Sequence, residues 1–422
     1  MGLEKKFEIY INELCKRIRN KDVHTSIKLE ISDHLLTLKE EAMSTGLSEE
    51  EAINKALARI GDVEILGKQL NKTHKAPLDV KTILPVVAAS LFGLLVMYYL
   101  QFHSAFTELQ DMRVFNKSLS FYLLGTLLML SLYTFDYRRL LKYSKHIYMG
   151  TVLILLLTVL FGVRVDGVPF LTLGFVNINF TEITPFLLVI SFAGIFHSWD
   201  WSDYRKSWLG VGIISGPIVI LSTTGALSTT IISIIVCVTI MYVSRASLKQ
   251  VIILAIATSI WSSFHLLFKS QKYTLLSPYA NQKLGAADFI GNGLNLTPGL
   301  IPDVHTDFIF AYIIYSFGWL AAFIAFVLIV LFICRILITA KSVNFAYGKM
   351  LITGLAATFA TQFILNILTN LGLSTLPGVS MPFMSFGGSH ILLEMLAVGL
   401  ILSIYRRRKT DNISWLDIKI NS

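Results

Sequence analysis

The sequence has few cysteines and few charges, and it opens on charged residues instead of a short apolar segment. Its three cysteines, Cys15, Cys237 and Cys334, lie far apart and show neither C-x-x-C nor metal-ligand spacing, so they imply no disulfide framework. Only 15% of the 422 residues are charged, whereas 54% are hydrophobic. Because the chain opens on charged residues, we expect no cleavable signal peptide, and we expect the first spanning helix to serve as the insertion signal.

Long apolar runs are what this sequence has in abundance. Runs of bilayer-spanning length, about 20 residues, recur from residue 82 onward. They predict an all-α, polytopic membrane protein with ten spans, near residues 82–101, 118–135, 146–163, 183–197, 207–223, 226–244, 250–268, 308–334, 347–371 and 387–404.

The positive charges predict the orientation of these spans. Residues 1–75 contain 13 Lys/Arg and 13 Asp/Glu, so the net charge of +9 belongs to the remaining chain. We attribute this surplus to basic cytoplasmic loops beside anionic membrane lipid, and we expect no nucleic-acid partner. With the N-terminus inside, fifteen Lys/Arg lie in inner loops and six in outer ones. Both termini are therefore expected in the cytoplasm, with loops 164–182, 269–307 and 372–386 outside.

A small helical domain is predicted ahead of the membrane part. Apolar residues recur at helical spacing through residues 1–75, and Ser48 with Glu51 forms a capping-box pair after Gly46. This segment resembles the helical prefix domain of several bacterial permeases, which suggests docking or regulation; a folding and solubility cap is the alternative. We therefore predict a cytoplasmic prefix domain at 1–75, a ten-span domain at 76–409 and a cytoplasmic tail at 410–422.

One acidic residue stands at the outer end of an apolar helix. Residues 308–334 carry no charge, and His305, Thr306 and Asp307 precede them. An ionisable group at the edge of a membrane helix is a candidate for function. A carboxylate that only interacts with the helix dipole is the alternative interpretation of Asp307.

Residues 382–408, "PFMSFGGSHILLEMLAVGLILSIYRRR", resemble the C-terminal signature of the SEDS family, the shape, elongation, division and sporulation proteins that include FtsW, RodA and SpoVE. "GNGL" at 291–294 and "IPDVHTDFIFAYIIYSFGWLAAF" at 301–323 are similar to the family's glycine-rich piece and its HTDFIFA stretch. Asp303 stands where many members have Glu. The resemblance covers residues from about 82 to 409.

Two further pairs agree with this resemblance. Gln362 and Asn366 match polar positions of the family's penultimate span, and Thr181-Glu182 falls at the Ser-Glu of its Gln-Pro-Ser-Glu motif.

The resemblance implies an activity. Family members are peptidoglycan glycosyltransferases that polymerise lipid II on the outer face of the membrane, with a class B penicillin-binding protein as transpeptidase partner. The family's essential aspartate falls on Asp307, which would act as general base on the 4-hydroxyl of the acceptor sugar while undecaprenyl pyrophosphate leaves. Inversion at the anomeric carbon is expected. A divalent cation, Mg or Mn, is plausible at the diphosphate, although the sequence shows no ligand set for a metal.

Several other residues are candidates for substrate binding. They lie in the outer segments and comprise His305, Thr306, Glu182, Lys283, Ser385, Gly387, Gly388 and Ser389. Alternatives stay open for several. His305 either orients the diphosphate or the base, or packs in its loop. Glu182 serves structural pairing more readily than catalysis. Gly387 and Gly388 serve backbone conformation more readily than ligand contact. Lys283 and Lys272 are candidate diphosphate contacts. For Glu394, packing or proton balance is expected.

The chain also departs from the family's pattern. Pro185 stands where a lysine usually follows the Ser-Glu pair, Pro169-Phe170 replaces Arg-Trp, and residues 222–229, "STTGALST", lack the charge of a Pro-Asp-x-Gly-Thr motif. The Gly-Tyr-Gln of the active loop is missing. Three functions therefore stay open: a polymerase, a transporter or flippase for a polyprenyl-linked precursor, and a scaffold that regulates a cell-wall transpeptidase.

Overall fold

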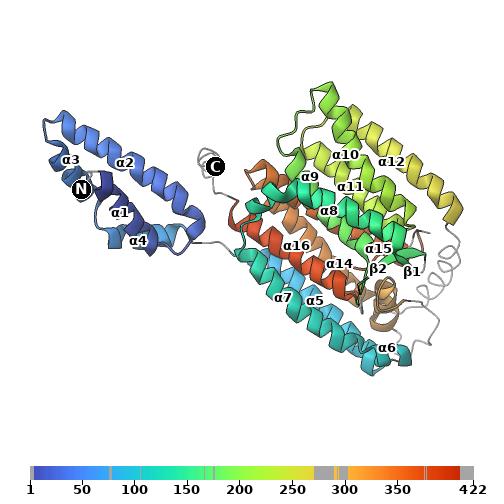
Figure 1. The fold of residues 1–422 in the computed structure, drawn as a ribbon. Coiled ribbons are helices and arrows are strands. Elements are labelled where there is room, and N and C mark those ends of the chain that lie inside the picture. The colour runs from blue at the N-terminus through green and yellow to red at the C-terminus, as the bar shows by residue number, and fades with distance from the viewer. Residues whose placement is uncertain are drawn as a thin grey trace. The chain divides into compact units, whose positions relative to one another are not determined.

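The computed structural model describes residues 4–75, 78–104, 106–165, 167–173, 176–269, 289–291, 293, 303–374, 376 and 378–408. The chain divides into two compact units. Unit 1 comprises Met1–Leu78 with Tyr405–Ser422, and unit 2 comprises Asp79–Ile404. Figure 1 shows both as helical bodies.

Unit 1 is built from short amphipathic helices. These are α1 (Glu4–Arg17), α2 (His24–Ser44), α3 (Glu49–Ile60) and α4 (Val63–Thr73), with the 3-10 turn η1 (Lys21–Val23) between the first two. The predicted capping box is present at the start of α3, where the Glu51 carboxylate accepts from the Ser48 backbone N–H at 3.0 Å. Leu14, Ile27 and Leu35 are at most 2% exposed and form the core, as the helical spacing predicted.

Unit 2 is a bundle of apolar helices (Figure 1). In chain order the elements are α5 (Val80–Phe102), α6 (Thr107–Met112), α7 (Val114–Thr134), η2 (Tyr137–Arg139), α8 (Leu140–Phe161), α9 (Phe180–Phe196), α10 (Tyr204–Thr223), α11 (Leu227–Val243), α12 (Leu248–Lys269), α14 (Ile309–Lys341), α15 (Ala346–Asn370) and α16 (Gly388–Arg406).

Each of the ten predicted spans coincides with one of these helices, and α6 is an additional short helix. Within the described residues, seven helical segments are long and apolar enough to cross a bilayer, and α9, α11 and the start of α12 form shorter apolar helices. The prediction of an all-α polytopic membrane protein is thereby confirmed.

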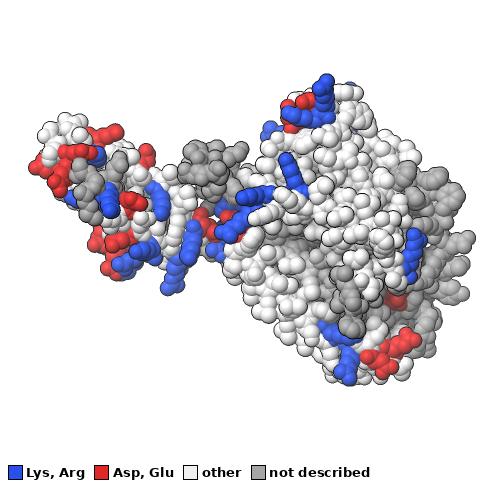
Figure 2. Space-filling view, in the orientation of Figure 1, with Lys and Arg blue, Asp and Glu red and all other residues white. Residues whose placement is uncertain are grey.

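Charge is sparse on unit 2. On the face that Figure 2 shows, the middle of the helical bundle is almost free of Lys, Arg, Asp and Glu, as expected for side chains that contact hydrocarbon.

One buried ion pair lies near a helix end, where both Nε and Nη2 of Arg335 donate to Oδ1 of Asp79, at 3.2 and 2.9 Å. This pair joins the start of α5 to α14.

The segment between α8 and α9 contains a small sheet that the sequence analysis did not predict. Strands β1 (Val163–Val165), β2 (Val168–Leu173) and β3 (Val176–Ile178) pair antiparallel in the order β1-β2-β3. Gly167 has a φ of +86°, the left-handed conformation that a tight turn between β1 and β2 requires. The sheet brings β2 to the end of the bundle at which α9 and α16 begin.

Helix α14 is broken near its start, which differs from the uniform span expected at 308–334. Gly318 has φ +87° and ψ 172°, a backbone conformation that is accessible only to glycine. The carbonyl of Phe289 accepts from Leu320 N–H at 3.3 Å, so a segment of the preceding loop fills the break. The kink therefore separates a short first piece of α14, which begins just after Asp307, from the longer apolar piece that follows.

The centre of unit 2 packs through aromatic rings. Phe383, in the loop before α16, lies 5.0 Å from Phe332 of α14 and 5.4 Å from Phe359 of α15, measured between ring centroids. All three are fully buried. These contacts anchor the loop that precedes α16 against the two helices next to Asp307.

Candidate functional site

A cavity of about 360 Å³ lies where α9, α14 and α16 begin. It is lined from β2, the start of α9, the turn before α11, the loops before α14 and α16, and the first turn of α16. Its ionisable side chains among the described residues are Glu182, Asp303, His305, Asp307 and His390. Three carboxyl groups and two imidazoles from three regions of the sequence therefore share one cavity.

Asp307 is positioned through its backbone by two asparagines of α15. The carbonyl oxygen of Asp307 accepts from Nδ2 of Asn366 at 3.0 Å and from Nδ2 of Asn370 at 2.8 Å. The side-chain oxygen of Asn370 accepts from the backbone N–H of Ala311 at 2.8 Å. Since the first N–H groups of a helix have no partner within it, Asn370 caps α14 from a neighbouring helix and holds Asp307 at the same time.

The loop before α16 holds the same segment from the other side. The Ser385 hydroxyl donates to the carbonyl of Thr306 at 2.7 Å, and Phe386 N–H donates to the carbonyl of His305 at 2.7 Å. The His305 ring packs on Phe386 with 5.5 Å between ring centroids. The His-Thr-Asp segment is therefore held by hydrogen bonds to two elements distant in sequence.

Gly378 completes the position of Asp307. A Cβ atom built on Gly378 would overlap the Cβ and carboxylate of Asp307, so only glycine allows the loop to pass there. This close approach confines the carboxylate to the cavity that it lines.

The surroundings make Asp307 a weaker acid than usual. Burial is the main reason, and the negative charges of Glu182 and Asp303 add to it, so that the pKa of Asp307 rises to about 7; a cationic His390 acts in the opposite direction. Burial lowers the pKa of the His305 imidazole, which favours its neutral form, while Asp303 opposes this shift. A carboxylate with a pKa near neutrality is suited to accept a proton from a substrate hydroxyl.

Glu182 reaches the cavity from the first turn of α9. Its Oε1 accepts from Nδ2 of Asn179 at 2.9 Å, and Oδ1 of Asn179 accepts from the Thr181 hydroxyl at 2.6 Å. The amide of Asn179 thus supplies the structural pairing considered for this carboxylate, and the cavity position leaves Glu182 available to a ligand.

The remaining candidates from the sequence fall into three groups. His305, Thr306, Gly387 and Ser389 line the cavity with Asp307 and Glu182. Ser385 is 2% exposed and bonds to backbone groups, and Gly388 lies so close to the Phe121 ring that a side chain would overlap it. Neither Gly387 nor Gly388 has a positive φ, so close approach matters more than backbone freedom. Lys272 and Lys283 lie outside the described residues.

Sequence reasoning missed Asn370, Gly378 and the partner of Glu394. Nε2 of His390 lies 2.9 Å from Oε1 of Glu394, one helical turn further into α16. Oε2 of Glu394 accepts from Phe383 N–H at 2.9 Å, and the Phe383 carbonyl accepts from the Tyr122 hydroxyl at 2.6 Å. Spacing of four residues between an acid and an imidazole in an apolar helix was the available signal.

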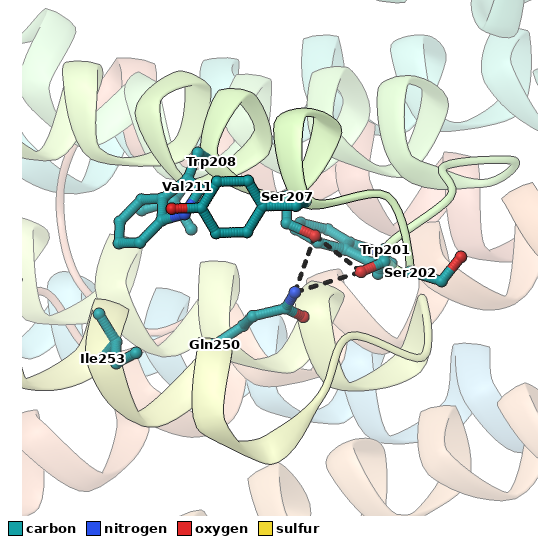
Figure 3. Close-up of a pocket in the computed structure, with 8 residues that line it drawn as sticks. Trp201, Ser202, Ser207, Trp208, Val211, Gln250 and Ile253 are labelled. Carbon is teal, nitrogen blue, oxygen red and sulfur yellow. Dashed lines mark hydrogen bonds between the residues drawn. The ribbon is translucent and has the colours of Figure 1, made fainter.

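A second hollow, of about 250 Å³, lies between α10 and α12 (Figure 3). Nε2 of Gln250 donates to the Ser207 hydroxyl at 2.8 Å and to the Trp201 carbonyl at 3.2 Å, and the Ser207 hydroxyl also donates to that carbonyl. No ionisable side chain other than Tyr204 lines this hollow among the described residues. The polar groups of Gln250, Ser207 and Trp201 hydrogen-bond to each other, which stabilises the packing of the helices. The described lining of this hollow lacks the carboxylates and imidazoles of the first cavity.

The fold and the cavity define a class: a polytopic membrane protein whose helix bundle carries a carboxylate-rich cavity at one end. The family model described as "Cell cycle protein", FTSW_RODA_SPOVE, matches residues 81–410. The chain belongs to this FtsW/RodA/SpoVE family, as the resemblance of its motifs indicated.

Individual relatives are similar in sequence over most of the chain. A probable peptidoglycan glycosyltransferase FtsW of Trichlorobacter lovleyi is 24% identical over 85% of this chain and 100% of its own. One from Coxiella burnetii is 28% identical over 60% of this chain and 75% of its own. Stage V sporulation protein E of Bacillus subtilis is 23% identical over 79% and 98%.

Solved structures are similar in fold. The rod shape determining protein RodA of Thermus thermophilus has a TM-score of 0.63 at 17% identity, over 80% of this chain and 99% of its own. A chain from a structure described as structural coordination of polymerization and crosslinking by a peptidoglycan synthase complex has a TM-score of 0.66 at 17% identity, over 79% and 99%.

Proposed function

We propose that the chain is a peptidoglycan glycosyltransferase that polymerises lipid II at the outer face of the bacterial cytoplasmic membrane. The observation that carries this proposal is Asp307, a carboxyl group with a pKa of about 7, held by Asn366, Asn370 and Gly378 in a cavity at the end of the bundle. The names of the relatives and the family's fold support the same activity.

Asp307 acts as general base in this proposal. It takes the proton of the acceptor's 4-hydroxyl as that oxygen forms a bond to the anomeric carbon of the donor. The bond from this carbon to the diphosphate oxygen breaks, and the diphosphate leaves with the electron pair. No covalent sugar–enzyme intermediate is needed, so the configuration at the anomeric carbon inverts.

A metal ion has no part in the steps that we derive. Among the described residues, no three His, Cys, Asp or Glu side chains form a group that could hold a metal ion. The described protein groups therefore do not fit a resident metal site, and a Mg or Mn ion at the diphosphate stays a separate proposal.

Topology and partner belong to the same proposal. The excess of Lys and Arg in alternate loops supports cytoplasmic termini and an outward-facing cavity. The family resemblance implies a class B penicillin-binding protein as the partner that would cross-link the glycan strands. The similar chain from a structure described as polymerization and crosslinking by a peptidoglycan synthase complex supports a cross-linking partner in general.

Purified full-length protein with labelled lipid II tests the proposal. The parent should form glycan strands and Asp307→Asn should form at least 100-fold less, because the amide cannot accept the proton. Asp111→Asn, an exposed position on α6, is the matched control and should retain activity. If Asp307→Asn formed glycan strands at the parent's rate, the assignment of Asp307 as general base would be rejected. If the parent formed no glycan strands, and both the parent and Asp307→Asn restored the growth of cells, the result would instead support a scaffold function.

A further inference from the structure

The cavity poses an electrostatic problem for the proposed substrate. Glu182, Asp303 and Asp307 line it, and the leaving group of the reaction is a diphosphate. Carboxylates repel this anion, so a positive group is needed where the diphosphate lies. Pro185, buried one turn after Glu182, occupies the position at which the resemblance implies a lysine.

Two imidazoles line the cavity, and their surroundings differ. His305 stacks near Phe386, and burial lowers the pKa of His305, which favours a neutral ring. His390 is 4% exposed and has the Glu394 carboxylate 2.9 Å from its Nε2. Glu394 is fully buried, whereas His390 lines the cavity. When the two side chains are both charged, the positive imidazolium of His390 is therefore the group that contacts the cavity.

The orientation of this pair is held from outside the helix. Phe383 N–H donates to the second oxygen of Glu394, and the Phe383 carbonyl is itself held by the Tyr122 hydroxyl of α7. The Phe383 ring packs against Phe332 and Phe359, which fixes the loop. Nε2 faces Glu394 and the residue lines the cavity, so a ligand that contacts this ring would do so through Nδ1.

We infer that His390, backed by Glu394, is a cationic contact for the diphosphate of the polyprenyl-linked substrate. This inference rests on the proposed function and assigns the site's anion contact to α16. Glu394 is a positioning residue, because it acts on the ligand only through His390. The pair supplies at the start of α16 the positive charge that Pro185 leaves out of α9.

Binding of undecaprenyl pyrophosphate to the detergent-solubilised full chain tests the inference without requiring turnover. His390→Gln should weaken binding by about 10- to 100-fold, the loss of one charge-assisted hydrogen bond, and Glu394→Gln should weaken it in the same direction. Undecaprenyl phosphate, with one phosphate fewer, serves to separate diphosphate recognition from binding of the shared lipid tail. His103→Gln, an exposed imidazole outside the cavity, should bind like the parent.

A second variant guards against an indirect effect on folding. His390→Lys retains a cation beside Glu394, so its affinity for undecaprenyl pyrophosphate should lie within about 3-fold of the parent's. A separate readout comes from the kinetics of lipid II polymerisation, in which His390→Gln should raise KM more than it lowers kcat. Parent-like binding by His390→Gln would overturn the inference and leave the glycosyltransferase proposal standing. Equal losses in the folded Gln and Lys variants would also overturn it. A parent that neither binds undecaprenyl pyrophosphate nor polymerises lipid II would reject both proposals.

Discussion

Gly378 lies so close to Asp307 that the space for a side chain at residue 378 is already occupied by the carboxylate. The loop before α16 and the loop before α14 therefore meet at an aspartate and a glycine that are 71 positions apart in the chain. This contact confines the group that we propose as the general base, and it leads directly to a prediction.

Gly378→Ala is expected to displace the Asp307 side chain and to lower kcat at least 10-fold, because a small shift of a catalytic group has a large effect on rate. The measurement is lipid II polymerisation together with thermal unfolding of the purified protein. Gly150→Ala is the matched control, since a Cβ there meets nothing within 4 Å. An active Gly378→Ala protein would show that the position of Asp307 tolerates this methyl group.

Asn370→Ala is expected to destabilise the protein and slow the reaction together. It leaves the buried N–H of Ala311 without its partner, at a cost of about 1–3 kcal/mol, and removes one of two donors to the Asp307 carbonyl. Thermal unfolding and kcat are measured in parallel. Asn116→Ala, at an exposed position, should change neither. Unchanged stability in Asn370→Ala would contradict the capping role.

The pH dependence of the reaction follows from Asp307. Its pKa is raised to about 7, and the base must be ionised to accept a proton, so kcat/KM should rise as pH increases through about 7. The raised value reflects burial and the carboxylates of Glu182 and Asp303.

Asp303→Asn should move this inflection to lower pH, because it removes a negative charge that raises the pKa of Asp307. The exchange also preserves the backbone: Asp303 has a φ of +46°, a conformation that asparagine adopts readily. Rates measured from pH 5 to pH 9 for both proteins provide the comparison. An inflection that stays in place, or moves upward, would contradict this account of the charges.

Gly318→Ala is expected to destabilise the fold by about 1–3 kcal/mol or more, since φ +87° with ψ 172° is strained for any residue with a Cβ. The added Cβ would also meet the backbone of the loop near Phe289. Thermal unfolding is the measurement, and Gly212→Ala, with open space around its Cβ, is the control. Equal stability of the two variants would mean that the kink in α14 can straighten without cost.

Local patterns in the sequence were sufficient for much of the fold. The apolar runs located a helix at each of the ten predicted spans, seven of which lie in segments long and apolar enough to cross a bilayer, because a bilayer requires that a spanning segment be long, apolar and internally hydrogen-bonded. The capping box of Ser48 and Glu51 was also predictable from local sequence, because its two partners are three residues apart. The three short strands were missed because segments of three to six residues between two spans carry too little periodicity.

For the site, the sequence by itself determined that an aspartate stands at the start of an apolar helix, and the motifs around it indicated the family. Only the tertiary structure decided that Asn370 and Gly378 hold Asp307, that the Ser385 hydroxyl bonds to the Thr306 carbonyl instead of lining the cavity, and that His390 lines it. The physical reason is the range of the interactions. Spans and caps depend on neighbours within a few positions, whereas the cavity depends on which faces of α9, α14, α15 and α16 pack together, and no local pattern encodes that choice.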